Sequence, residues 1–171
     1  SVEANSAHPL ARAIMSYAAK IDVTPDVVEN FQSITGKGIE ATLQGVPVSI
    51  GSMKWANEKT AITEKVQEEI EELQSQGKSV MIILGENMYI GHLAVADDVR
   101  SSSRSIISKL KNLGIKHVIM LTGDHPTTAQ AIAKTVGVTD VRAGLMPEDK
   151  LTAIKSLIAE RGRVAMVGDG M

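Results

Sequence analysis

The sequence contains no cysteine, and very few of its 171 residues are aromatic. The absence of cysteine excludes a disulfide scaffold, a thiolate metal site and a cysteine nucleophile, and it is typical of a reducing compartment. With so few aromatic rings the core must be aliphatic, and nucleic acid bases find almost no platform for stacking. The aromatic residues are Tyr17, Phe31, Trp55 and Tyr89.

A large excess of charge of one sign and a long hydrophobic run are also absent. The formal net charge of −2 gives no field that would hold nucleic acid or an anionic membrane. Glu86, Asn87 and His92 interrupt the charge-poor stretch 79–96, which therefore fits two short strands better than a membrane span. We expect a soluble chain without a nucleic acid partner.

The charge and the hydrophobic pattern both divide the chain into two parts. The first ninety-four residues carry seven basic and twelve acidic side chains, whereas the remainder carries eleven and eight. We place the domain boundary between residues 95 and 96. The chain starts without Met and stops in a glycine-rich turn, so we expect it to be a piece of a longer protein.

The pattern in residues 1–95 predicts an α+β domain with an antiparallel sheet. A helix begins near Pro9, and we expect one buried face formed by Leu10, Ala13, Ile14, Tyr17 and Ala18. The apolar pattern over 62–73 predicts a second helix, which Gly77 terminates. Strands are expected at 27–34, 39–43, 46–50, 80–84 and 88–95, the last four forming two hairpins.

In residues 96–171 helices alternate with short apolar runs, which predicts a parallel sheet. Helices are expected around 106–113 and at 127–136 and 147–159. Buried strands are expected at 118–121 and 164–167, with a short strand at Val141.

Polar groups follow both buried strands of this second part. Thr122-Gly123-Asp124 follows the first strand and Gly168-Asp169-Gly170 the second. Either segment alone could be an ordinary turn, but the repetition favours a site where carboxylates, a hydroxyl and backbone amides hold Mg²⁺ and a phosphoryl group. Lys150, in the first turn of a helix, could neutralise phosphoryl charge or lie solvated on the surface.

Weaker signals occur in the first part. His8 stands where a helix begins, and a lone histidine is usually a surface or capping residue. Gly36-Lys37-Gly38 and Gly51-Ser52 could be turns, or places where the backbone lies close to a flat ligand.

The motifs gain specificity from their order along the chain. They are Ser6-Ala7-His8-Pro9-Leu10-Ala11, Gly36-Lys37-Gly38, Gly51, Met120-Leu121-Thr122-Gly123-Asp124, Pro147-Glu148-Asp149-Lys150-Leu151 and Val167-Gly168-Asp169-Gly170. From Glu3 to Met171 this arrangement closely resembles the large cytoplasmic loop of the heavy-metal-transporting P-type ATPases. The resemblance implies an antiparallel-sheet ATP-binding domain, residues 1–95, inserted in a haloacid-dehalogenase-like, Rossmann-like parallel-sheet phosphorylation domain, of which residues 96–171 are an incomplete part.

The resemblance also implies a role for each candidate residue. ATP would be bound by the first part, Thr122 would hydrogen-bond the phosphoryl oxygens, and Asp124 would help to orient the nucleotide. Lys150 would counter charge at an aspartyl phosphate, and Asp169 would hold Mg²⁺. The ATP-binding residues would be Glu3, His8, Gly36, Gly38, Gly51 and Ser52.

The sequence departs from the family in three places. Ala7 stands where the family commonly has Glu, and Ser52 where it has Asn, which weakens a polar nucleotide contact. The Asp-Lys-Thr-Gly-Thr sequence that carries the phosphorylated aspartate occurs nowhere in the chain. We therefore expect the chain to bind ATP without phosphorylating itself.

For the intact protein the resemblance implies a pump on the cytoplasmic side of a cell membrane, with transmembrane and actuator domains outside this chain. The transported heavy-metal ion would also bind elsewhere, and zinc, cadmium or cobalt is slightly favoured over copper. Two other interpretations remain open: a haloacid-dehalogenase-type phosphatase whose first part is a substrate cap, and a non-catalytic nucleotide sensor.

Overall fold

The computed structural model of the protein describes residues 1–6, 9–96 and 99–168. The chain forms two compact units, Ser1–Asp98 and Val99–Met171, whereas the sequence placed the boundary between residues 95 and 96. No helix in the described ranges is long and apolar enough to cross a lipid bilayer.

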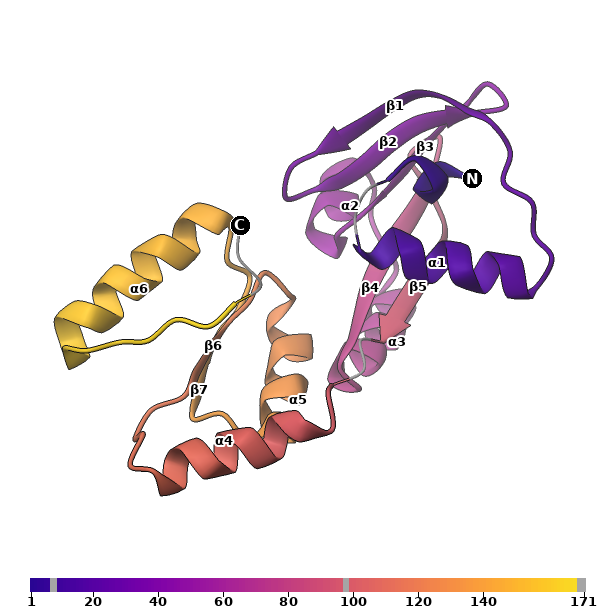
Figure 1. Cartoon of the computed structure of the whole chain (residues 1–171). Coiled ribbons are helices and arrows are strands. Elements are labelled where there is room, and N and C mark those ends of the chain that lie inside the picture. Colours follow the sequence, from indigo (N-terminus) through magenta and orange to yellow (C-terminus); the bar gives the residue numbers. More distant parts are fainter. Residues whose placement is uncertain (7–8, 97–98, 169–171) are drawn as a thin grey trace. The chain divides into compact units, whose positions relative to one another are not determined.

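Unit 1 is built on a five-stranded antiparallel sheet whose strands follow one another in chain order (Figure 1). The strands are β1 (Val28–Ile34), β2 (Gly38–Leu43), β3 (Val46–Gly51), β4 (Lys78–Gly85) and β5 (Met88–Ala96). Both predicted hairpins are confirmed. Their two-residue turns, Gln44-Gly45 and Glu86-Asn87, have positive φ at both positions, as tight hairpins between twisted strands require.

Helices cover both faces of this sheet, as Figure 1 shows. The helices are η1 (Val2–Asn5), α1 (Pro9–Lys20), α2 (Met53–Lys59) and α3 (Glu64–Ser75). On one face Val2 of η1 packs with Ile39, Ala41 and Ile50. On the other face Ala56 of α2 and Ile70 of α3 pack with Ile82, Leu84 and Ile62. The alternation of side chains along each strand therefore gives the unit two separate apolar clusters.

Two expectations for the helices of unit 1 were wrong. The predicted buried face of α1 included Ala13 and Tyr17, but both are exposed, Tyr17 by 65%, and the buried residue is Ala11. The helix contacts the rest of the unit along a narrow stripe, so its apolar residues are not all covered. Ile62 lies before α3 and not within it, and the short helix α2 was not predicted.

Unit 2 contains the two-stranded parallel sheet of β6 (Ile119–Leu121) and β7 (Asp140–Arg142). Its helices are α4 (Ser102–Asn112), α5 (Pro126–Val136) and α6 (Pro147–Arg161). The predicted end of α5 at Gly137 is confirmed, because Gly137 adopts the left-handed conformation typical of helix ends.

The prediction of a buried strand at 164–167 was wrong. These residues form no strand, and Met166 and Val167 are 64% and 96% exposed. The strand β6 is half-buried, not buried. Apolar runs of this kind become buried strands only when neighbouring strands pair with them, and β6 and β7 are the two strands of unit 2 among the described residues.

Candidate functional site

The two glycine segments singled out in unit 1 lie side by side at one end of its sheet. Gly38 and Gly51 are directly paired across β2 and β3. The Ser52 amide donates a hydrogen bond to the Lys37 carbonyl oxygen, at 3.0 Å. The antiparallel register therefore brings 36–38 and 51–52 together, although a whole hairpin separates them in the sequence.

This end of the sheet has no room for side chains on its glycines. A Cβ on Gly38 would lie closer than 3.0 Å to the Ile50 carbonyl oxygen, and Gly38 has a φ of +152°. A Cβ on Gly51 would lie closer than 3.0 Å to both the Lys37 carbonyl oxygen and the Trp55 ring. Internal packing alone thus requires glycine at positions 38 and 51. Gly51 is buried and Gly38 half-buried, whereas the backbone of Gly36 is exposed, so a flat ligand could approach this end of the sheet at 36–38.

The helix α2 supports the glycine segments. The Ser52 hydroxyl caps it by accepting a hydrogen bond from the Trp55 amide at 3.3 Å. Trp55 itself is only 5% exposed. The Lys37 ammonium donates to a Glu58 carboxylate oxygen at 2.6 Å. This hydrogen bond holds the pKa of Glu58 below its ordinary value, aided by the positive charges of Lys37 and Lys54.

Of the two remaining candidates in unit 1, Glu3 is described and His8 lies outside the described residues. Glu3 is buried, with 6% exposed, and belongs to η1. Its neighbour Val2 packs with Ile39 and Ile50, which directly adjoin Gly38 and Gly51. The structure therefore brings the helix that carries Glu3 to the glycine end of the sheet.

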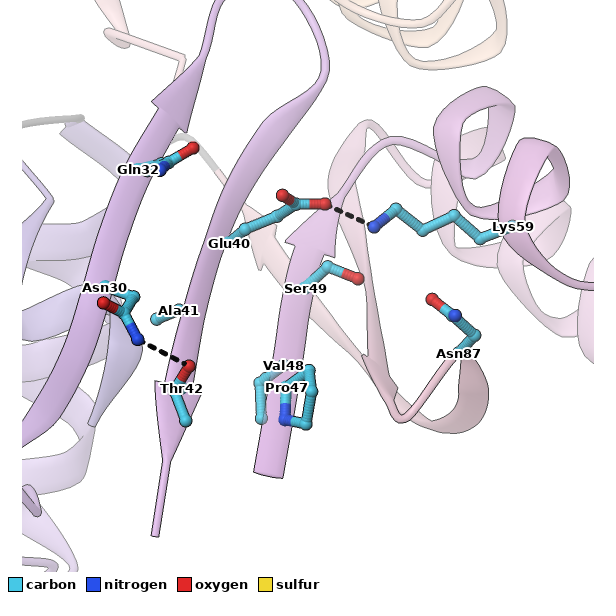
Figure 2. A pocket seen from close by; sticks show the side chains of 10 residues that line it. All are labelled: Asn30, Gln32, Glu40, Ala41, Thr42, Pro47, Val48, Ser49, Lys59 and Asn87. Carbon is cyan, nitrogen blue, oxygen red and sulfur yellow. Dashed lines mark hydrogen bonds and ion pairs between the residues drawn. The ribbon is translucent and has the colours of Figure 1, made fainter. Parts of the chain in front are cut away.

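A polar pocket lies on the face of the sheet opposite Val2. Figure 2 shows that its side chains come from β1, β2, β3, the end of α2 and the β4–β5 turn. Asn30 donates to the Thr42 hydroxyl at 3.3 Å, and Lys59 forms an ion pair with Glu40. None of the predicted site residues lines this pocket of about 260 Å³. The alternation of polar residues in β1 and β2 was the only sequence signal for it.

In unit 2 the predicted Thr122-Gly123-Asp124 segment forms an internally bonded loop at the carboxyl end of β6. The Thr122 hydroxyl donates to the Asp124 carboxylate at 2.7 Å and accepts from the Asp124 amide at 3.1 Å. The amides of Gly144 and Leu145 donate to the carbonyl oxygens of Asp124 and Thr122. The loop is thereby held against the segment that leads into α6.

Two helices begin beside this loop. His125 caps α5, and Met146 precedes α6, where its amide donates to the Asp149 carboxylate at 3.0 Å. Helix N-termini carry unpaired amides and partial positive charge, which favour bound anions.

Lys150 and Asp169 are the other two candidates of unit 2. Lys150 lies half-buried in the first turn of α6. Among the described residues no ion pair joins it to Asp124. Asp169 lies outside the described residues, so its predicted meeting with Thr122 stays a prediction. In the described ranges no three histidine, aspartate or glutamate side chains form a cluster that could hold a metal ion.

The loop geometry predicts the effect of Thr122→Val. This isosteric change removes both hydrogen bonds of the hydroxyl, and we expect the free energy of unfolding of unit 2 to fall by about 1–2 kcal/mol. Urea denaturation followed by circular dichroism measures the change. Thr135→Val is the matched control, because its hydroxyl bonds only the Ala131 carbonyl on an exposed helix surface. Equal losses in both variants would contradict the structural role of Thr122.

Comparison with known proteins identifies the class. The chain matches the model of the haloacid dehalogenase-like hydrolases over residues 1–171, and it belongs to this hydrolase family.

Within that class its relatives are metal-transporting ATPases. The chain is 49% identical over 175 residues to a probable cadmium-transporting ATPase of Alkalihalophilus pseudofirmus, covering all of this chain and 24% of that protein. It is 38% identical over 171 residues to a copper-exporting P-type ATPase of Staphylococcus haemolyticus, covering all of this chain and 21% of that protein.

A solved structure agrees with these relatives. The crystal structure of a zinc-transporting PIB-type ATPase in the E2.Pi state superposes with a TM-score of 0.59 at 35% identity, over 99% of this chain and 27% of that one. The resemblance to heavy-metal P-type ATPases is thus confirmed. The chain spans about a quarter of the length of the curated relatives it matches.

Proposed function

We propose that this chain is the ATP-binding part, with a portion of the phosphorylation domain, of a pump that couples ATP hydrolysis to heavy-metal transport. The observation that carries the proposal is that Gly36, Gly38, Gly51 and Ser52 lie together at one end of a sheet, in a chain 49% identical to a probable cadmium-transporting ATPase. In the intact pump this part would lie on the cytoplasmic side of the membrane. Transmembrane and actuator domains of the same protein would be its partners.

In unit 1 the proposed ligand is ATP. The exposed backbone of Gly36 and the half-buried backbone of Gly38 suit the flat face of a purine, with the buried Gly51 paired to Gly38 beneath them. The buried Glu3 belongs to the helix that packs at the same end of the sheet. Ser52 uses an oxygen lone pair as the α2 cap, so its hydroxyl proton remains able to donate to the nucleotide. His8 would orient the nucleotide.

In unit 2 the proposed task is to hold the phosphoryl group. The Thr122 hydroxyl can donate to a phosphoryl oxygen in place of Asp124, and the starts of α5 and α6 favour the negative charge. The Lys150 ammonium would add a positive charge from the first turn of α6.

The donors of this loop fit Mg²⁺, which prefers hard oxygen ligands such as the Asp124 carboxylate. Asp169 would hold the ion, which would supply charge neutralisation to the transferring phosphoryl group. Because the chain has no Asp-Lys-Thr-Gly-Thr sequence, it would bind ATP without phosphorylating itself.

The ion that the pump would transport is proposed from the relatives. Identity is 46% and 49% to two probable cadmium-transporting ATPases, against 38% to the copper-exporting one. We therefore propose cadmium, or the chemically similar zinc or cobalt, rather than copper. The same relatives favour a pump over a haloacid-dehalogenase-type phosphatase or a nucleotide sensor.

Calorimetric titration with ATP tests the proposal. We expect the chain to bind ATP and His8→Ala to bind it about tenfold more weakly, equivalent to about 1.4 kcal/mol. His117→Ala is the matched control, since His117 is an exposed histidine of unit 2 that contacts Arg161. No binding by the unaltered chain would refute the proposed function, and unchanged affinity of His8→Ala would remove that residue from the site.

A further inference from the structure

The turn between β1 and β2 contains two glycines, so interactions with its neighbours must restrict its backbone conformation. Gly36 has a φ of 72° and Gly38 a φ of 152°, so both residues adopt conformations that side chains rarely permit. A turn with two glycines has more backbone freedom than other turns, and a binding site built from it loses affinity if the turn must be ordered on binding.

Lys37, the residue between these glycines, makes three contacts. Its amide donates to the Ile34 carbonyl at 3.0 Å, and its carbonyl accepts from the Ser52 amide at 3.0 Å. Its ammonium donates to Glu58 at 2.6 Å. The first two contacts fix the turn to its own sheet, whereas the third ties it to α2.

The carboxylate of Glu58 is presented by a helix that is itself held in place. Trp55, one turn earlier in α2, is buried against Gly51, and the Ser52 hydroxyl caps the helix. The same helix therefore contacts both glycine segments, one through a buried ring and the other through an ion pair.

Stability alone does not account for this ion pair. Its two side chains are 46% and 47% exposed, and exposed ion pairs contribute little to folding. Its larger effect should be on the conformation of the turn that it ties down.

We infer that Lys37 and Glu58 are positioning residues of the nucleotide site: their ion pair holds the Gly36–Gly38 backbone in the conformation that accepts the purine. This inference rests on the proposed ATP binding. It assigns no contact between ATP and either side chain.

Calorimetric titration with ATP at low salt tests the inference. Glu58→Gln and Lys37→Met should each weaken binding by about three- to fivefold, because the turn must then be ordered on binding. The charge-exchanged variant, Lys37→Glu with Glu58→Lys, should restore affinity to within about twofold. Glu40→Gln, which breaks the other ion pair of α2, is the matched control and should leave affinity unchanged.

Each result decides the question. Rescue by the charge-exchanged variant supports positioning, since a Lys37 that bound the phosphates directly could not be replaced by glutamate. Unchanged affinity of Glu58→Gln, or failure of the rescue, would overturn the inference.

A second readout separates this inference from the proposed function. Amide hydrogen exchange at Lys37 and Ser52, whose amides donate the two hydrogen bonds of the turn, should accelerate in Glu58→Gln without nucleotide and recover in the charge-exchanged variant. If the unaltered chain binds no ATP while exchange responds in this way, the proposed function fails. The ion pair would then still be shown to order the backbone of the turn. If exchange does not respond, the inference fails whatever the chain binds.

Discussion

Trp55→Ala is expected to lower the free energy of unfolding of unit 1 by about 3–5 kcal/mol, the range for removing a large buried aromatic side chain. The Trp55 ring is 5% exposed, lies against Gly51, and has the Lys59 ammonium 4.6 Å from its centroid. Its removal leaves a cavity beneath the glycine end of the sheet. Urea denaturation followed by far-ultraviolet circular dichroism measures the loss. Tryptophan fluorescence cannot be used, because the substitution removes the sole tryptophan of the chain.

Trp55→Phe is the control for this prediction. Phenylalanine keeps an aromatic ring against Gly51, so a clearly smaller loss is expected. A loss below about 1 kcal/mol in Trp55→Ala would mean that α2 does not support the sheet as described.

Gly51→Ala is the second change with a large expected effect. The added methyl group would meet the Lys37 carbonyl and the Trp55 ring, and overpacking of this kind costs about 1–3 kcal/mol. We expect reduced stability of unit 1 and weaker ATP binding together, because β3 must move away from the glycine turn. Denaturation and calorimetric titration of the same sample measure both.

The chain offers a matched control for this variant. Gly91 lies in β5 of the same sheet, has an ordinary φ, and has no atom within 4 Å of the position of a Cβ. Gly91→Ala should change stability by no more than about 0.5 kcal/mol and leave ATP affinity unaltered. Equal behaviour of the two alanine variants would show that close packing at Gly51 is not what makes glycine necessary there.

Local patterns were sufficient to predict most of the secondary structure. Alternating apolar residues around Gln44-Gly45 and Glu86-Asn87 predicted the two hairpins, because turn chemistry and burial agree there. The 3.6-residue periodicity predicted α3 and α5, and Gly137 marked where α5 ends.

The failures occur where tertiary context decides. The helix α2 is only seven residues long, and its stability comes from the Ser52 cap and from the burial of Trp55, which no short pattern shows. The run 164–167 has the composition of a buried strand, yet composition does not provide the neighbouring strands that burial requires. Tyr17 has the right spacing for the face of α1, but the packed stripe of that helix is too narrow to cover it.

In the candidate site, too, local motifs could be read from the sequence, whereas contacts between distant segments could not. Motifs identified Gly36, Gly38, Gly51 and Thr122 from the sequence. The structure adds that Gly38 pairs with Gly51 and that the Thr122 hydroxyl donates to the Asp124 carboxylate. Glu58 could not be found in this way, because its contact with Lys37 joins a loop to a helix that was not predicted.

The most direct test of the account is a titration of the ¹⁵N-labelled chain with ATP and Mg²⁺, followed by nuclear magnetic resonance. The account predicts saturable shifts of the amide signals of Glu3, Gly36, Gly38, Gly51 and Ser52. It predicts little change at Asn30 and Thr42, which line the pocket on the opposite face of the sheet. An unperturbed spectrum at millimolar ATP, or shifts confined to that pocket, would contradict the claim that the glycine end of unit 1 binds the nucleotide.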